Sequence, residues 1–184
     1  RKGSVAVLTG SFNPLHKGHI GLMEAVKTSL VSVGVSSILA EISLSNADKP
    51  AMGEDDALSR IAQFAGRWPV SVISKSALFV EKARVYNGDV SFVLGYDTAV
   101  RVLDIKYYGN SVQSTLAALS ELQTRGCSFL VAGRLVNGVF KTFSTESPHL
   151  PFPQFHSLFT DIPEAAFRSD ISSSQIRKQQ QQIK

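Results

Sequence analysis

The chain has 184 residues, of which 43% are hydrophobic and 18% charged, and its formal net charge is +4 at pH 7. This size and composition fit one globular domain spanning residues 1–184, and the absence of a long apolar run or a signal peptide predicts a cytoplasmic protein with no membrane partner. The basic residues are scattered, so phosphorylated small molecules explain the charge and nucleic acid is not expected as a partner.

Two smaller features of the composition bear on where the chain comes from and where it works. The sequence opens at Arg1 without an initiator methionine, which is compatible with a domain excised from a longer chain. Its single cysteine, Cys127, excludes an intrachain disulfide and favours a reducing compartment. Cys127 stands at the start of a strand-like run, so we expect a buried structural thiol.

Strand-like runs alternate with helix-like runs, which is the pattern of a parallel sheet with crossover helices. The first run, 4–9, is apolar at nearly every position, as a strand buried on both faces should be. The predicted strands are 4–9, 37–44, 70–74, 90–94, 128–132 and 157–162. The predicted helices are 18–32, 54–65, 77–86, one capped by Ser111 that ends near 126, and one from 172 onward.

The stretch 133–155 differs from the rest because it has no clear period and holds three of the seven prolines. We expect an irregular excursion there, with a short hairpin around Asn137-Gly138. Long loops inside compact domains are uncommon and are often functional.

The segment from Gly10 to His19, G-S-F-N-P-L-H-K-G-H, lies where the first strand should give way to a helix. In open α/β sheets such junctions bind anions, because helix N-terminal N–H groups attract negative charge. Gly10 allows a tight turn, and Gly18 allows phosphate to approach the backbone. The imidazoles of His16 and His19 can donate to phosphate oxygens. No P-loop and no G-x-G-x-x-G occurs, so the segment predicts a different kind of triphosphate site.

Zinc is the main alternative for a pair of histidines three residues apart. The remaining soft ligands, Cys127, His149 and His156, stand at no recognisable ligand spacing from the pair. The triphosphate site is therefore favoured.

Three segments together resemble the HxGH nucleotidylyltransferase superfamily, and within it the nicotinamide/nicotinate mononucleotide adenylyltransferases. Residues 10–19 resemble the signature G-[ST]-F-[ND]-P-x-H-x-G-H, and residues 171–177, I-S-S-S-Q-I-R, resemble I-S-S-T-x-I-R with one Thr-to-Ser change. Residues 92–97, F-V-L-G-Y-D, are similar to the family's hydrophobic strand ending in G-x-D. The three lie in the family's order, near its spacing, and span nearly the whole chain.

The resemblance implies a Rossmann-like, doubly wound parallel sheet and an enzyme that joins ATP to a phosphomonoester with release of pyrophosphate. It also implies Mg²⁺ on the β- and γ-phosphates of the nucleotide. The implied catalytic residues are His16, His19 and Arg177. The implied nucleotide-binding residues are Gly10, Ser11, Phe12, Gly18, Gly95, Asp97, Ser172, Ser173 and Ser174. The candidates for binding the second substrate are Asn13, Asn46, Lys49 and Tyr107, the last as a platform on which a pyridine ring would stack.

Several functions stay open at this point. Nicotinamide or nicotinate mononucleotide is the leading second substrate, because Asn13-Pro14 fits that branch better than the F-D-x-x-H of cytidylyltransferases. Phosphopantetheine with ATP, or glycerol phosphate or phosphocholine with CTP, would keep the same chemistry. A class I tRNA-synthetase fragment is less favoured, since the chain is short and lacks a K-M-S-K-S loop. A non-catalytic nucleotide-binding domain is also less favoured, since both phosphate motifs are retained.

Overall fold

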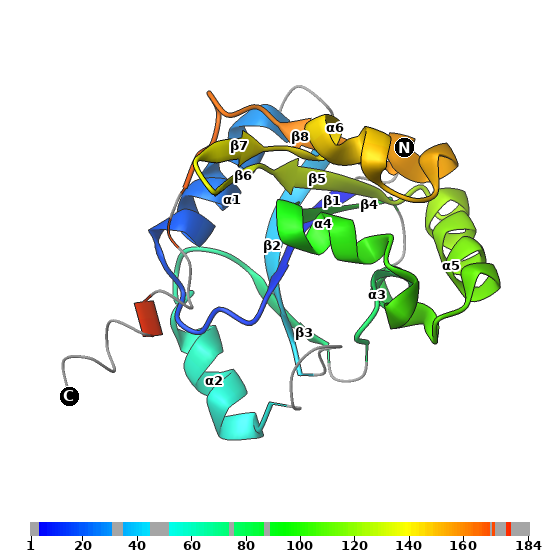
Figure 1. Cartoon of the computed structure of the whole chain (residues 1–184). Coiled ribbons are helices and arrows are strands. Elements are labelled where there is room, and N and C mark those ends of the chain that lie inside the picture. The colour runs from blue at the N-terminus through cyan, green and yellow to red at the C-terminus, as the bar shows by residue number, and fades with distance from the viewer. Residues whose placement is uncertain are drawn as a thin grey trace.

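The structure is a computed structural model that describes residues 4–30, 35–44, 52–73, 76–86, 89–169, 171 and 176–177. Its centre is a six-stranded sheet in the order β3-β2-β1-β4-β5-β8, and every neighbouring pair is parallel (Figure 1). The strands are β1 (Ser4–Gly10), β2 (Val35–Ser43), β3 (Val70–Ile73), β4 (Val90–Gly95), β5 (Ser128–Ala132) and β8 (Phe159–Ile162). The expected doubly wound parallel sheet is therefore confirmed.

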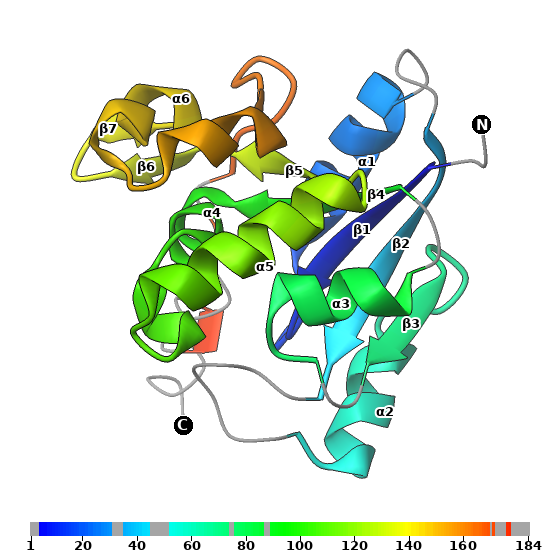
Figure 2. The same ribbon diagram turned by 90° about the vertical axis from the view of Figure 1, so that its right-hand side faces the viewer.

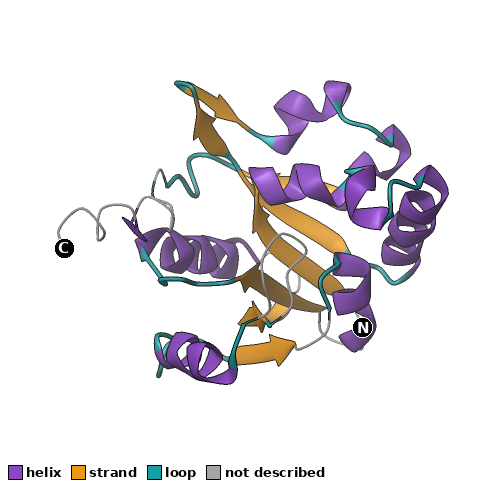
Figure 3. Ribbon diagram, turned by 60° about the horizontal axis from the view of Figure 1, so that its bottom comes forward, coloured by secondary structure: helices purple, strands orange, loops and turns teal. Residues whose placement is uncertain are grey.

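Helices cover both faces of this sheet (Figure 3). They are α1 (Lys17–Leu30), α2 (Glu54–Ala62), α3 (Phe79–Val85), α4 (Tyr96–Val102), α5 (Val112–Thr124) and α6 (Phe143–Glu146). Figure 2 shows α3 and α5 in front of the sheet and α1 behind it. Each face has its own buried core, which is what a strand order that winds outward from β1 in both directions requires.

The two cores explain why the central strands are apolar at almost every position. Met23 and Val26 of α1 pack with Ala6 and Leu8 of β1 on one face. On the other face Val7 packs in the core to which α3 and α5 contribute. Successive residues of β1 thus point into opposite cores, and neither set is exposed to water.

Residues 133–155 hold more regular structure than the sequence suggested. The expected hairpin is present as β6 (Arg134–Val136) and β7 (Val139–Lys141), with both turn residues, Asn137 and Gly138, at positive φ. It is followed by α6 and by two short 3-10 helices, η2 (Ser147–His149) and η3 (Pro153–Leu158). Because η3 takes Ser157 and Leu158, the last strand begins two residues later than predicted.

Candidate active site

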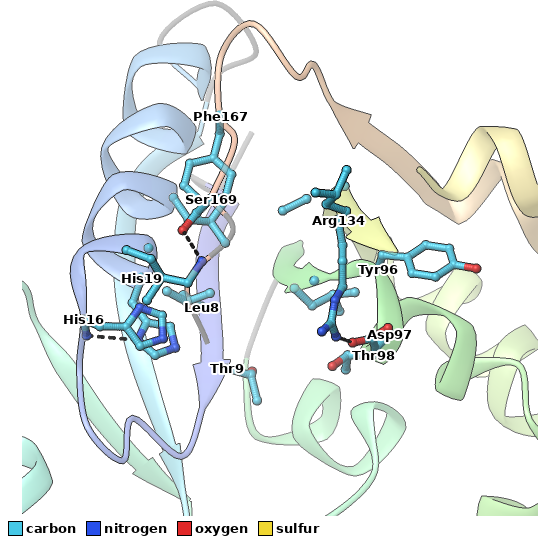
Figure 4. A pocket seen from close by; sticks show the side chains of 18 residues that line it. Leu8, Thr9, His16, His19, Tyr96, Asp97, Thr98, Arg134, Phe167 and Ser169 are labelled. Carbon is cyan, nitrogen blue, oxygen red and sulfur yellow. Dashed lines mark hydrogen bonds and ion pairs between the residues drawn. The ribbon is translucent and has the colours of Figure 1, made fainter. Parts of the chain in front are cut away.

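A cavity of about 480 Å³ lies where the carboxyl ends of β1, β4 and β5 meet the first turns of α1 and α4 (Figure 4). Its position is the switch point of the sheet, since β1 pairs with β2 on one side and β4 on the other. Its size is that of an ordinary small-molecule pocket. It is lined by Leu8, Thr9, His16, Gly18, His19, Leu22, Leu94, Gly95, Tyr96, Asp97, Thr98, Ala132, Gly133, Arg134, Leu135, Phe167, Ser169 and Ile171.

The two signature histidines form one wall of this cavity. Their rings stack with centroids 3.7 Å apart, and the backbone N–H of His16 donates to Nδ1 of His19 at 3.3 Å. That hydrogen bond makes Nδ1 of His19 an acceptor, so its hydrogen stands on Nε2. Nδ1 of His16 is buried without a partner among the described residues, and buried acceptors without a partner are less rare in proteins than buried N–H groups without one. Both rings are therefore best assigned as Nε2–H tautomers, which are hydrogen-bond donors.

The histidines are held neutral in the absence of ligand. Burial lowers the pKa of His16. Burial, with a smaller contribution from the neighbouring His16, lowers the pKa of His19 from 6.5 to about 4. At neutral pH the wall thus offers neutral imidazoles, each with one N–H donor.

This buried imidazole makes stability depend on pH in a defined direction. Between about pH 6.5 and pH 4 the unfolded chain binds a proton at His19 and the folded chain does not, so lowering the pH through this window destabilises the fold. The full effect is roughly 2–4 kcal/mol. Urea unfolding at pH 7.5 and pH 4.5 should therefore show a smaller loss for His19→Gln than for the wild type. An equal loss in the two proteins would contradict a buried neutral His19.

Gly18 is enclosed by the segment that follows β8. A Cβ at Gly18 would lie 2.6 Å from Oγ of Ser169 and 3.0 Å from Nδ1 of His16. Phe167 of the same segment lies 3.4 Å from where a Cβ of Gly21 would stand, one turn along α1. Because Gly18 and Gly21 have no side chains, the segment that carries Phe167 and Ser169 can pass close to the first turn of α1. This segment closes one side of the cavity.

The opposite wall carries an ion pair between Asp97 of α4 and Arg134 of β6 (Figure 4). Gly95 caps the N-terminus of α4 and lines the cavity, and nothing lies within 4 Å of where a Cβ would stand on it. Both charged side chains are about half exposed, at 47% for Asp97 and 52% for Arg134. The pair is consequently weak and exchangeable, because exposed ion pairs contribute about 0–1 kcal/mol.

The rest of the first signature, residues 10–15, forms a loop that packs against the histidines through Phe12. The ring of Phe12 is 1% exposed and meets His19 edge-on, with centroids 5.0 Å apart. It also covers Gly10, where a Cβ would stand 3.0 Å from the ring. Phe12 adopts φ 43°, a left-handed conformation that costs a non-glycine residue on the order of 1–3 kcal/mol. Its ring supports His19 from below and is not available for stacking on a ligand.

Arg177 reaches this loop from the other end of the sequence. Its guanidinium donates to the backbone carbonyl of Asn13, which joins the first and last signatures. This contact brings the two signatures together at Arg177, but neither Arg177 nor Asn13 is among the residues that line the cavity. Ser172, Ser173 and Ser174 lie outside the described residues, as do Asn46 and Lys49.

The comparison with protein families decides the assignment. The sequence profile described as cytidylyltransferase-like matches residues 7–179, which takes in all three signature segments. The chain belongs to the cytidylyltransferase-like family. The family is one of nucleotidyltransferases, transferases that act on a nucleoside triphosphate and a phosphate-bearing substrate.

A relative of this cytidylyltransferase-like protein is found in Schizosaccharomyces pombe, where it is provisionally named nicotinamide mononucleotide adenylyltransferase. The two are 34% identical over 115 residues, a stretch that covers 56% of this chain and 44% of the relative. The matched part of the chain therefore spans less than half of the relative's length.

Tyr107 of the cytidylyltransferase-like chain stands apart from the cavity. It belongs to the 3-10 helix η1 (Ile105–Tyr108), and it is not among the residues that line the cavity. The ammonium of Lys106 lies 4.7 Å from the centroid of its ring. One face of this candidate platform is thus occupied by a cation.

Several residues of the site were missed by reasoning from sequence. Arg134 was not singled out, although it stands two residues after the end of the buried strand β5, at the edge of the sheet where ligands bind. Helix α4, which presents Asp97, was also not expected, because Gly95-Tyr96-Asp97 follows the strand with no intervening loop. Thr9 and Ser169 carry no pattern that sets them apart from other hydroxyl residues.

The described residues also bear on metals and membranes. Among them, no three histidine, cysteine or acidic side chains are grouped as the ligands of a metal would be. Cys127 is 4% exposed, as expected for a structural thiol. None of the helices in the described part of the chain is both long enough and apolar enough to cross a membrane.

Proposed function

We propose that this chain is an adenylyltransferase that joins ATP to nicotinamide or nicotinate mononucleotide, giving a dinucleotide and pyrophosphate. One observation carries the proposal. The neutral donors of His16 and His19 face the same cavity as Asp97 and Arg134, at the switch point of a parallel sheet. The choice of second substrate is supported by the name of the yeast relative and by the Asn13-Pro14 of the signature.

The reaction needs no covalent intermediate on the protein. An oxygen of the mononucleotide phosphate attacks the α-phosphorus of ATP, the bond from that phosphorus to the bridging oxygen breaks, and pyrophosphate leaves with the electron pair. The protein contributes position and charge stabilisation. Nε2–H of His16 and of His19 would donate to triphosphate oxygens on which negative charge grows.

The metal expected for this reaction fits a site that has few acidic ligands. Nucleotidyltransferases generally use Mg²⁺, and this ion usually keeps several waters and binds through substrate phosphates. When bound with the nucleotide, Mg²⁺ would supply neutralisation of the β- and γ-phosphates. The chain's own cations would act beside it on the remaining phosphate charge.

The two charged groups of the opposite wall would then separate. The carboxylate of Asp97 would accept hydrogen bonds from the ribose hydroxyls, and the guanidinium of Arg134 would turn to a phosphate oxygen. The exchange costs little because the ion pair is half exposed. Gly95, beside Asp97, leaves open space for the nucleoside.

The binding roles of the other candidate residues are proposed from the resemblance to the family's signatures. Gly10, Ser11 and Gly18 would shape the phosphate-binding turn, and Ser172, Ser173 and Ser174 with Arg177 would bind the β- and γ-phosphates. Asn13, Asn46 and Lys49 would bind the second substrate. Tyr107 would serve as its stacking platform only if the Lys106 ammonium leaves the ring or the pyridine takes its other face.

Release of pyrophosphate measured with ATP or CTP against a panel of phosphomonoesters tests the proposal. We expect turnover with ATP and nicotinamide or nicotinate mononucleotide, formation of the dinucleotide, and poor turnover with CTP. Faster turnover with phosphopantetheine, glycerol phosphate or phosphocholine would replace the second substrate and leave nucleotidyl transfer intact. No pyrophosphate with any pair would contradict the proposed function.

A further inference from the structure

Side chains at the end of α2 form hydrogen bonds with the loop that leads to His16 and His19. No residue of α2 lines the cavity itself. The side-chain amide of Gln63, at the C-cap of α2, donates from Nε2 to the carbonyl of Phe12 at 3.0 Å. Its Oε1 accepts from the N–H of Leu15 at 2.7 Å. The amide of Gln63 thereby forms two hydrogen bonds with backbone groups of the loop, one on each side of Asn13-Pro14. It uses one donor and one acceptor, as a backbone amide would.

Arg60, three residues earlier on the same face of α2, extends this contact. Its Nη1 donates to the carbonyl of Ser11 at 2.7 Å, and its Nε donates to Asp56 at 2.9 Å. The side chain of Arg60 is only 11% exposed. The carboxylate of Asp56 therefore fixes the guanidinium against the loop and leaves it little freedom to serve a ligand.

The loop needs such support at Phe12. This residue is held in a left-handed conformation, and strained residues persist only where the surroundings over-determine them. The surroundings here are Gln63 on its own carbonyl, Arg60 on the preceding carbonyl, and the ring of Phe64 edge-on at 4.8 Å. All three come from residues 60–64, at and just past the end of α2.

Phe12 in turn positions the imidazole of His19, the candidate catalytic residue. Its ring meets His19 at 5.0 Å and an interplanar angle of 73°, and it forms part of the burial around that imidazole. A shift of Phe12 would alter both where the Nε2 of His19 stands and how much water reaches the ring.

We propose that Gln63 and Arg60 are positioning residues of the nucleotidyl-transfer site, which hold the loop 11–15 so that Phe12 fixes the His19 ring against the cavity. The expected effect of these residues on turnover rests on the proposed function. The expected effect on the position and burial of the His19 ring follows from the contacts alone. Neither residue touches the cavity, so both act through the loop.

An NMR titration of His19 in the full chain without substrate tests the positioning directly. In the wild type its pKa is expected near 4. In Gln63→Leu, which keeps the size of the side chain and loses both hydrogen bonds, the pKa should rise toward the ordinary 6.5 because water reaches the ring. Arg60→Gln should give a smaller rise, and Arg60→Lys, which can still donate to Ser11, should restore part of the wild-type value.

Arg84→Gln is the matched control, because it breaks another helix arginine–carboxylate pair, Arg84 with Glu121, outside the loop. It should leave the titration of His19 unchanged. A folded Gln63→Leu or Arg60→Gln protein whose His19 titrates as in the wild type would overturn the proposal. If Gln63→Leu does not fold, the Arg60 variants decide it alone.

Kinetics then separate positioning from binding. Gln63→Leu should lower kcat on the order of 10- to 100-fold, with a smaller change in the KM for ATP, since a displaced donor loses its transition-state contact. An unchanged kcat alongside a shifted His19 pKa would overturn the catalytic part. A wild type without transferase activity would count against the proposed function only, because the titration needs no substrate.

Discussion

His19→Ala should lower kcat for the proposed adenylyl transfer about 10²- to 10³-fold and should change the KM for ATP much less. The reason is that a preorganised donor contacts the triphosphate most strongly as charge develops, and removing one such donor costs about 2.7–4 kcal/mol of barrier. The structure gives this donor a fixed orientation, through the hydrogen bond from the His16 backbone and the edge contact with Phe12. Pyrophosphate release with ATP and nicotinamide mononucleotide measures the effect.

The control for this experiment is His149→Ala. His149 is exposed in η2 and is absent from the cavity lining, so its removal should leave kcat within twofold or so of the wild type. His19→Gln keeps an N–H donor on a side chain of similar reach and should lose less activity than His19→Ala. Near-full transfer by a folded His19→Ala protein would remove the imidazole from the mechanism.

The strands and the histidine wall could be predicted because they depend on local patterns. A run such as 4–9 is apolar on both faces, and only a strand between two helix layers explains it. The pair His16 and His19 falls at the strand-to-helix junction, where chain geometry alone directs side chains to the carboxyl edge of the sheet.

The contacts that complete the site could not be predicted, because they join segments far apart in the sequence. Gln63 stands 48 residues from Leu15 and 51 from Phe12, and Asp97 stands 37 from Arg134. Gln63 and Arg134 look like ordinary surface residues in their own segments, and the G-x-D segment that singles out Asp97 names no partner for it. Their partners follow from the strand order and from the angle at which α2 crosses the sheet, which no single-segment pattern contains.

Glu41 is a charged residue in a buried strand, and its place there becomes clear only from its partners in the fold. It interrupts the apolar run of β2, yet its side chain is fully buried. It forms an ion pair with Nζ of Lys82 on α3, and the hydroxyl of Tyr86 donates to its Oε2 at 3.2 Å. Lys82 also lies 3.0 Å from Oγ of Ser43, so each charged group has more than one partner. Burial, with a smaller contribution from the Glu41 charge, raises the pKa of Tyr86, which stays a donor at neutral pH.

Lys82→Met should lower the free energy of unfolding by about 3–5 kcal/mol, because it leaves the Glu41 carboxylate buried without its counter-charge. The methionine fills nearly the same volume, so lost packing is a minor part of the effect. Urea unfolding at pH 7 measures the loss as a shift of the midpoint at constant slope.

The double variant Glu41→Leu/Lys82→Met separates two contributions to the free energy of unfolding. One is the cost of a buried carboxylate without its counter-charge, and the other is the net stabilisation by the ion pair. It should regain most of the stability lost in Lys82→Met, since a buried ion pair is often replaced by apolar residues at little cost. Arg84→Gln, which breaks the exposed pair with Glu121, should lower stability far less than Lys82→Met, because an exposed ion pair contributes little. If Lys82→Met lost no more than Arg84→Gln, the charges of Glu41 and Lys82 would have to be reached by water. If the double variant stayed as unstable as the single one, the hydrogen bonds to Ser43 and Tyr86 would carry the stabilisation instead of the charge pair.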